Sequence, residues 1–166
     1  MTELELYDNK AFQEVLAMIK EARTKVNKAI NNGLIELYWS IGEYISNKSK
    51  KDSWGSGTVR NLSDFLKETE TNSKGFSSQN LWRMKQFYET YYKNKKLSLL
   101  VREIGWTNNI IIVSQTKTEE EREFYLKLTA REKYSKEELS RQLETGLYER
   151  SMLSRENISP IVREIS

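Results

Sequence analysis

The sequence contains no cysteine and no histidine, and it has one proline among its 166 residues. The lack of cysteine excludes disulfides and thiolate nucleophiles. Without histidine as well, Cys/His zinc sites and mechanisms that use imidazole as the base are excluded. The exclusion of these chemistries is the firmest conclusion that the composition permits. We expect neither a metal nor a cofactor.

The chain also has no apolar run of about 18 residues, the length at which a membrane-spanning helix is indicated. Its acidic start, Met1-Thr-Glu-Leu-Glu-Leu6, differs from the basic and then apolar pattern of a signal peptide. We therefore expect a cytoplasmic protein with no membrane partner.

The composition predicts one folded domain. Hydrophobic residues make up 37% of the chain and aromatic residues 11%, which is enough for one core at this length. We expect a flexible N-terminus over residues 1–9 and a helical domain over residues 10–151. Residues 152–166, which include Pro160, resemble a linker towards a further C-terminal domain.

A long helical pattern dominates the first third of the chain. Apolar residues recur every three or four positions, as on one face of an amphipathic helix. The Asn31-Asn32-Gly33 triplet ordinarily ends a helix, but the pattern keeps its phase beyond it. We favour one long helix, with a helical hairpin as the alternative, and the same stripe could pair two copies of the chain. The stripe consists of Phe12, Val15, Leu16, Ile19, Ala22, Val26, Ala29, Ile30, Leu34, Leu37, Ile41, Tyr44 and Ile45.

Shorter helices are predicted from there on. A polar loop over residues 46–57 precedes a short helix capped by Thr58, and a loop over residues 69–75 follows that helix. Residues 97–101 fit a helix or a strand, and Ile110–Val113 is assigned to a helix although its β-branched residues favour a strand. Two C-terminal helices are expected, one from Thr118 to Lys133 and one from Lys136 to about Arg150, after a capping box at Ser135. The predicted class is all-α, with a long N-terminal helix or hairpin, a helix-turn-helix-like unit and two C-terminal helices.

Residues 78–92 form a candidate recognition helix. Its apolar positions, Leu81, Met84, Phe87, Tyr88 and Tyr91, share one side, and the other side carries Gln79, Trp82, Arg83, Gln86 and Thr90. Gln and Arg can make bidentate contacts to adenine and guanine edges, and free amides near Ser77 and Ser78 suit a phosphate oxygen. The pattern alone favours a plainer interpretation, in which Trp82 packs on another helix and the glutamines face water.

Basic residues are concentrated in the middle of the chain. Residues 51–105 hold 10 basic and 6 acidic side chains, whereas the net charge of the whole chain is only +3. Between Lys74 and Lys96 six basic residues accompany a single acid, Glu89. A phosphate backbone would favour such a local excess, although solubility alone can also produce it.

No nuclease motif is evident. A PD-(D/E)xK centre needs metal-binding acids and a lysine two positions after the second acid. Among all Asp and Glu residues, only Asp8 is followed by a lysine at that spacing, and it lies in an acidic terminus without strand context. We therefore assign no catalytic residue to this chain.

Several segments together resemble the N-terminal domain of the YhcG family, bacterial proteins in which this domain precedes a PD-(D/E)xK nuclease domain. The resemblance covers about residues 10–151 and implies a mostly helical module that binds nucleic acid for an attached nuclease. A histidine that often follows Trp106 in the family is absent here, so no role for it carries over. The matching segments are Leu37-Tyr-Trp-Ser-Ile-Gly42, Trp54-Gly-Ser-Gly57 with Leu62-Ser63, Gly75-Phe-Ser77 with Asn80-Leu81, Met84 with Phe87-Tyr88, Trp106, Arg122-Glu-Phe-Tyr125, Ser140-Arg-Gln-Leu143 and Leu147-Tyr-Glu-Arg150.

Three hypotheses for function follow from these observations. In the first, the chain is a non-catalytic DNA-binding module that reads a groove with Lys74, Ser77, Ser78, Gln79, Arg83 and Gln86 and contacts the backbone with Lys85, Lys93, Lys95 and Lys96. In the second, it is an assembly module that pairs through the N-terminal stripe or docks a nuclease domain through Trp82. The third is a stand-alone enzyme, which would require a deep pocket lined by several acids.

Overall fold

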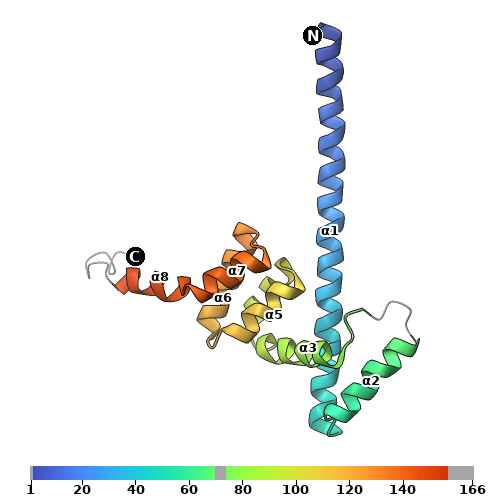
Figure 1. Cartoon of the computed structure of the whole chain (residues 1–166), viewed down its shortest axis with the longest axis vertical. Coiled ribbons are helices and arrows are strands. Elements are labelled where there is room, and N and C mark those ends of the chain that lie inside the picture. Colours follow the sequence, from blue (N-terminus) through green and yellow to red (C-terminus); the bar gives the residue numbers. More distant parts are fainter. Residues whose placement is uncertain (1, 70–73, 157–166) are drawn as a thin grey trace. The chain divides into compact units, whose positions relative to one another are not determined.

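The computed structural model describes residues 2–69 and 74–156, except for the side chains of residues 4–8 and 156. Within those ranges the chain forms helices and no strand, which confirms the all-α class (Figure 1). The elements are α1 (Glu3–Lys51), α2 (Ser56–Thr69), α3 (Ser78–Tyr91), α4 (Lys95–Leu100), the short 3-10 helix η1 (Val101–Glu103), α5 (Trp106–Gln115), α6 (Glu119–Glu132), α7 (Lys136–Glu144) and α8 (Leu147–Glu156).

The N-terminal pattern forms one uninterrupted helix, α1, so the hairpin alternative was wrong. Gly33 does not take the positive φ that would end a helix there, and a Cβ at this position would meet no other atom within 4 Å. The chain divides into two units, Met1–Leu34 and Ile35–Ser166, and each is described by itself.

The first unit consists of the N-terminal part of α1. From Phe12 onward its large apolar side chains are exposed, and Phe12 itself is 70% exposed. An apolar stripe that is solvated along its length lacks the burial that normally stabilises an amphipathic helix. The exposed stripe is made of Phe12, Val15, Leu16, Ile19, Val26, Ile30 and Leu34.

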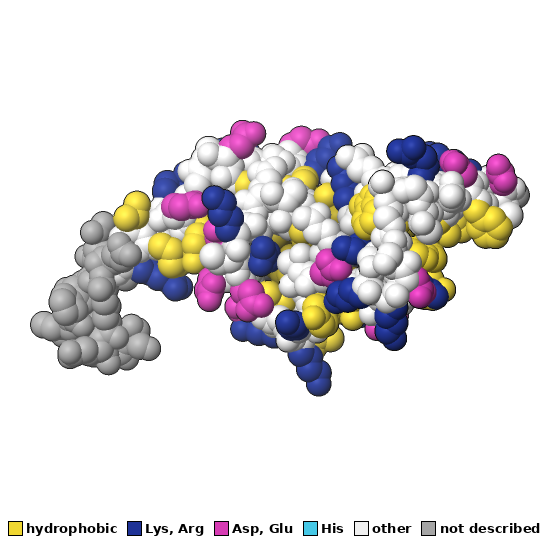
Figure 2. All heavy atoms as spheres, turned by 90° about the horizontal axis from the view of Figure 1, so that it is seen from below, with side chains coloured by type: hydrophobic (Ala, Val, Ile, Leu, Met, Phe, Trp, Pro, Cys, Tyr) yellow, Lys and Arg dark blue, Asp and Glu magenta, His cyan; other side chains and the backbone are white. Residues whose placement is uncertain are grey.

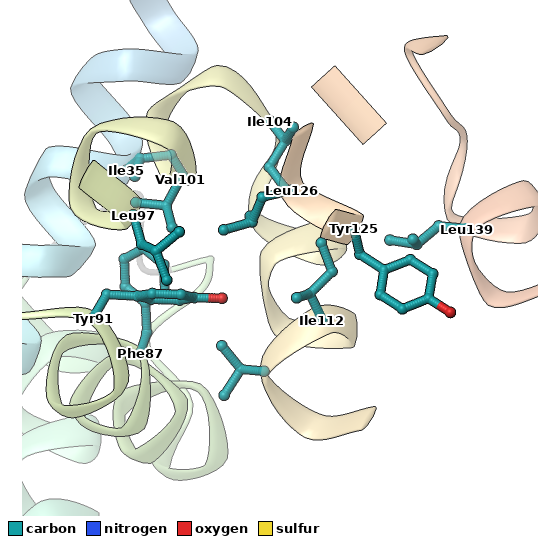
Figure 3. Close-up of a cluster of buried hydrophobic side chains, with 11 residues drawn as sticks. Ile35, Phe87, Tyr91, Leu97, Val101, Ile104, Ile112, Tyr125, Leu126 and Leu139 are labelled. Atoms are coloured by element: carbon teal, nitrogen blue, oxygen red, sulfur yellow. The ribbon is translucent and has the colours of Figure 1, made fainter. Parts of the chain in front are cut away.

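The second unit is built around two clusters of buried side chains. In the larger cluster Phe87 and Tyr91 of α3 lie beside Leu97 and Val101 (Figure 3). The half-buried Trp106 of α5 packs against both clusters and so joins them. The larger cluster consists of Ile35, Phe87, Tyr91, Leu97, Val101, Ile104, Ile112, Val113, Tyr125, Leu126 and Leu139, and the smaller of Tyr38, Ile45, Val59, Leu81 and Met84.

Close packing of α1 on α3 depends on Gly42. A Cβ built at this position would lie 2.0 Å from the carbonyl oxygen of Met84 and 2.6 Å from its carbonyl carbon. Only glycine permits two helix backbones to approach so closely. The position of α3 against residues 35–51 therefore depends on the absence of a Cβ atom at Gly42.

The predicted loop over residues 46–57 was wrong for its first half, because α1 continues to Lys51. Ser46 is buried there, and its hydroxyl donates a 2.7 Å hydrogen bond to Glu89 of α3, so a polar sequence is held in a helix by tertiary contact. The helix ends at Lys51, and Ser53 follows it with a positive φ. α2 then begins at Ser56, and Thr58 lies inside its first turn and does not cap it.

The C-terminal helices differ from the prediction mainly at one point. α6 begins at Glu119, one residue after the predicted start, and Thr118 is its N-cap. Ser135 caps α7 by accepting a hydrogen bond from the N–H of Glu138. However, α7 ends at Glu144, because Gly146 adopts a φ of +67° and starts a new helix, α8. The ambiguous residues 97–101 form the end of α4 and the start of η1, and Ile110–Val113 lies in α5 as expected.

Candidate nucleic-acid interface

The α2-α3 unit has the order of a helix-turn-helix, and hydrogen bonds fix the entry to its second helix. The hydroxyl of Ser63 in α2 donates a 2.7 Å bond to the carbonyl of Phe76. The side chain of Ser77 accepts a 3.1 Å bond from the N–H of Asn80 and thereby caps α3. Ser77 is therefore the N-cap of α3, and its hydroxyl oxygen is already used as an acceptor.

Asn80 ties this turn to α5. Its side-chain amide donates to the carbonyl of Gly75, and its oxygen accepts a 2.9 Å bond from the indole N–H of Trp106. Gly75 itself has a φ of +99°, and a Cβ there would lie 2.6 Å from the hydroxyl of Tyr38. The orientation of α3 relative to the rest of the second unit is thus set by glycine geometry and by a buried polar contact.

The sides of α3 divide as predicted for most residues, but Tyr88 on the apolar side and Trp82 and Thr90 on the other side are all half-buried. Leu81, Met84, Phe87 and Tyr91 are fully buried. The three residues Gln79, Arg83 and Gln86 are exposed, and their spacing of four and three positions places them along one flank of the helix. Among the described residues, no ion pair joins Arg83 to a carboxylate.

The other predicted residues fall into two groups. Lys74, Lys93 and Lys95 are exposed at the two ends of α3, and Ser78 is half-buried at its first position. In contrast, Lys85 is held 3.1 Å from Glu89 and lies over the ring of Trp82, and Lys96 pairs with Glu123. These two lysines already have carboxylate partners, which a phosphate would have to replace.

The carboxylates that hold them are stabilised in their charged form. Burial by itself would raise the pKa of Glu89, but hydrogen bonds from Ser46 and Lys85 and the charges of Lys85 and Lys50 lower it overall. Hydrogen bonds from Lys127 and Lys96 lower the pKa of Glu123. On the face shown in Figure 2, Lys and Arg side chains are interspersed with Asp and Glu side chains.

One group of side chains was missed by the sequence prediction. The rings of Tyr88 and Tyr92 are stacked, with centroids 5.1 Å apart and planes 21° from parallel. The ammonium groups of Lys93 and Lys50 lie 5.6 Å and 6.0 Å from the centroid of the Tyr92 ring. The four-residue spacing of the two tyrosines could have revealed the stack. The contribution of Lys50 could not be foreseen while residues 46–57 were assigned to a loop.

Two of the cavities in the second unit bear on other chemistry. A cavity of about 360 Å³ has a wholly apolar lining that includes Tyr44, Trp54 and Phe76. Another of about 350 Å³, between α6 and α8, contains Glu120 and Glu123 together with Lys127 and Arg155. Throughout residues 2–69 and 74–156, no group of three or more acidic side chains is arranged to hold a metal ion. Neither cavity is therefore the deep acidic pocket that the enzyme hypothesis requires.

Comparison with known families identifies the family to which the chain belongs. Residues 14–150 match the model of the DUF1016 N-terminal domain, which is most of the 166-residue sequence. The chain belongs to the DUF1016 N-terminal domain family. This is the N-terminal domain of the YhcG family, so the resemblance seen in the sequence is confirmed. No curated protein and no solved structure matches the chain.

The matched residues of this DUF1016 N-terminal domain include α2, α3 and the whole of both buried clusters. In the part of the chain that is described, no helix combines the length and the apolar character needed to cross a membrane. The predicted boundaries at residues 10 and 151 stay predictions, and Pro160 lies outside the described residues.

Proposed function

We propose that this domain binds DNA through the exposed flank of α3 that carries Gln79, Arg83 and Gln86. The observation that supports this most is that all three side chains are exposed on one flank of a helix whose core-facing residues are fully buried. Those buried residues are Leu81, Met84, Phe87 and Tyr91. A rigid helix that presents two amides and one guanidinium has the donor and acceptor set that reads base edges in a major groove.

Contacts to the DNA backbone would come from the ends of α3. Lys74 and the amides after Ser77 lie at its N-terminus, where the helix dipole favours an anion. Lys93 and Lys95 follow its C-terminus, about 20 Å away along a helix of this length. Lys85 and Lys96 would contribute only if a phosphate replaced Glu89 and Glu123, so we expect their contribution to be smaller.

The domain acts in this proposal as a non-catalytic module. The chain belongs to the DUF1016 N-terminal domain family. We propose, from the resemblance to YhcG-type proteins, that a nuclease domain of the PD-(D/E)xK class follows this module. The module would bring that nuclease to DNA in the cytoplasm, and it would need no metal or cofactor of its own.

The proposal is tested by titrating a fluorescein-labelled DNA duplex and measuring its anisotropy at several salt concentrations. We expect Arg83→Ala to weaken binding by about 5- to 150-fold, as for loss of one base-contacting arginine. The matched control is Arg131→Ala in the last turn of α6, which removes the same charge from an exposed position. Equal losses in the two variants, or no binding by the unaltered protein at low salt, would contradict the proposal.

A second candidate function is pairing of two copies through the first unit. The specific observation is the exposed stripe from Phe12 to Leu34, whose apolar side chains are solvated along one side of α1. A second copy would present an identical stripe, so two such helices could bury each other's apolar faces as a coiled coil does.

Light scattering tests this candidate. A dimer would have twice the 19.6 kDa mass of one chain. Ile19→Asp, in the middle of the stripe, should then give the monomer mass, whereas Thr24→Asp, on the far side of the same helix, should leave the dimer intact. A monomer mass for the unaltered protein at high concentration would exclude this function.

A further inference from the structure

The Tyr88-Tyr92 stack lies on the opposite side of α3 from Arg83. Nine helical steps of 100° separate Arg83 from Tyr92, which amounts to half a turn, and Tyr92 keeps helical backbone angles at the C-cap. The stack therefore forms a surface distinct from the Gln79-Arg83-Gln86 flank. Tyr92 is 40% exposed, whereas Tyr88 and the neighbouring Trp39 are half-buried beneath it.

The Tyr88 end of the stack packs against the core, and the Tyr92 end is exposed to solvent. The Tyr88 ring is fixed between Tyr92 and Trp39, whose ring meets it edge to face at a centroid distance of 5.2 Å. Trp39 also lies edge to face with the buried Phe87, so the support continues into the larger cluster. A rigid ring pair that is anchored in the core and exposed at one end can accept a third flat ring without any rearrangement of the core.

The charges around the stack select the chemistry of that third ring. Lys50 and Lys93 both lie over the Tyr92 ring, and Glu89, the nearest acid on α3, is engaged by Ser46 and Lys85. Glu43, which is exposed, is the other acid whose charge acts on Tyr88. Two lysines at the open end disfavour a cationic ligand and favour one that joins an aromatic ring to an anion.

A nucleotide has that combination, because its base stacks and its phosphate accepts from lysine. The cation-π contacts that hold the two ammonium groups over the ring are weak at an exposed site, and lysine side chains rotate freely. An arriving base can therefore displace them towards its own flanking phosphates. Exposed aromatic rings beside lysines are the usual means by which proteins hold unpaired bases of any sequence.

We propose that Tyr92, supported by Tyr88 and flanked by Lys50 and Lys93, is a stacking platform for an unpaired base of single-stranded DNA. This inference rests on the proposed function in that the ligand is DNA, but it assigns a different face of α3 and a different form of the ligand. A strand that leaves a duplex could then be held on one side of the helix while the duplex is read on the other.

The test is binding of the full chain to a fluorescein-labelled oligothymidylate of about 12 nucleotides, measured by anisotropy. We expect Tyr92→Ala to weaken binding by about 5- to 150-fold and Tyr92→Phe, which keeps the ring, to change it by less than about threefold. The matched control is Phe65→Ala, because Phe65 is also an exposed aromatic residue but lies on α2. An equal loss in Tyr92→Ala and Phe65→Ala, or no loss in Tyr92→Ala, would overturn the platform.

Two further experiments distinguish a failure of the platform from a failure of the proposed function. Thymidine monophosphate at equal nucleotide concentration should not displace the oligonucleotide. Displacement at that concentration would show a free-nucleotide site and overturn the assignment to a strand. The duplex titration with Tyr92→Ala should be unchanged, while Arg83→Ala should weaken it. If Arg83→Ala weakens duplex binding and Tyr92→Ala leaves oligothymidylate binding intact, only the platform fails; if neither DNA binds, both proposals fail.

Discussion

At the scale of single residues, Glu89 connects three features of the second unit. It accepts from Ser46 of α1, pairs with Lys85 within α3, and lies beside the tyrosine stack. These contacts hold its pKa below the ordinary value of 4.5. A carboxylate whose pKa is lower in the folded state adds stability above its unfolded pKa and loses that contribution as the pH falls through its folded pKa.

Glu89→Gln should therefore make stability less sensitive to acid. Between about pH 6 and about pH 3 the unaltered protein should lose more unfolding free energy than the variant, because only the carboxylate must take up a proton. Urea unfolding at a series of pH values measures this difference. Glu137→Gln on α7, which changes an exposed carboxylate that has no ion pair with a described residue, is the control. A variant whose acid dependence equals that of the unaltered protein would refute this role of Glu89.

At the scale of elements, the sequence predicted the helices whose signals are local. α3 and α6 begin where Ser77 and Thr118 cap them, because a capping side chain acts on the backbone two or three residues away. The errors occurred where a distant contact decides the outcome. Residues 46–51 remain helical because Ser46 meets Glu89, forty-three positions along the chain.

In the candidate site too, the features set by local sequence were predicted and those set by distant contacts were not. The exposure of Gln79, Arg83 and Gln86 follows from helical periodicity and was predicted, as was the burial of Leu81 and Phe87. The pairing of Lys96 with Glu123 joins α4 to α6 and could not be predicted without knowing that these helices meet. Periodicity indicates which side of a helix faces outward, but not which neighbour neutralises a charge there.

Two glycines of α1 offer a matched pair of predictions. Gly42→Ala should lower the free energy of unfolding by about 1–3 kcal/mol or more, because the new methyl group meets the backbone of Met84. Gly33→Ala, the same change in the same helix with open space around it, should instead raise stability by about 0.5–1 kcal/mol.

Thermal unfolding followed by circular dichroism compares the two glycine variants directly. A Gly42→Ala protein as stable as the unaltered one would show that α1 and α3 do not approach as closely as described. A destabilised Gly33→Ala protein would instead indicate that the surroundings of Gly33 are closed.

At the scale of the whole molecule, the two proposals assign DNA contacts to two different sides of one helix, α3. The net charge of +3 is too small for a general attraction to DNA to dominate, and several lysines are paired with carboxylates. Any specific binding must therefore depend on a few unpaired side chains in fixed positions. This makes the location of the contact, more than its strength, the feature that separates the proposed function from non-specific attraction.

The most direct measurement of the central claim is a map of the contact surface. A duplex titrated into isotope-labelled protein should shift the amide and side-chain NMR signals of Gln79, Arg83 and Gln86, with smaller changes at Lys74 and Lys95 and none on α7. Shifts confined to other helices, or spread evenly over every exposed lysine, would contradict the assignment of the exposed flank of α3 to DNA.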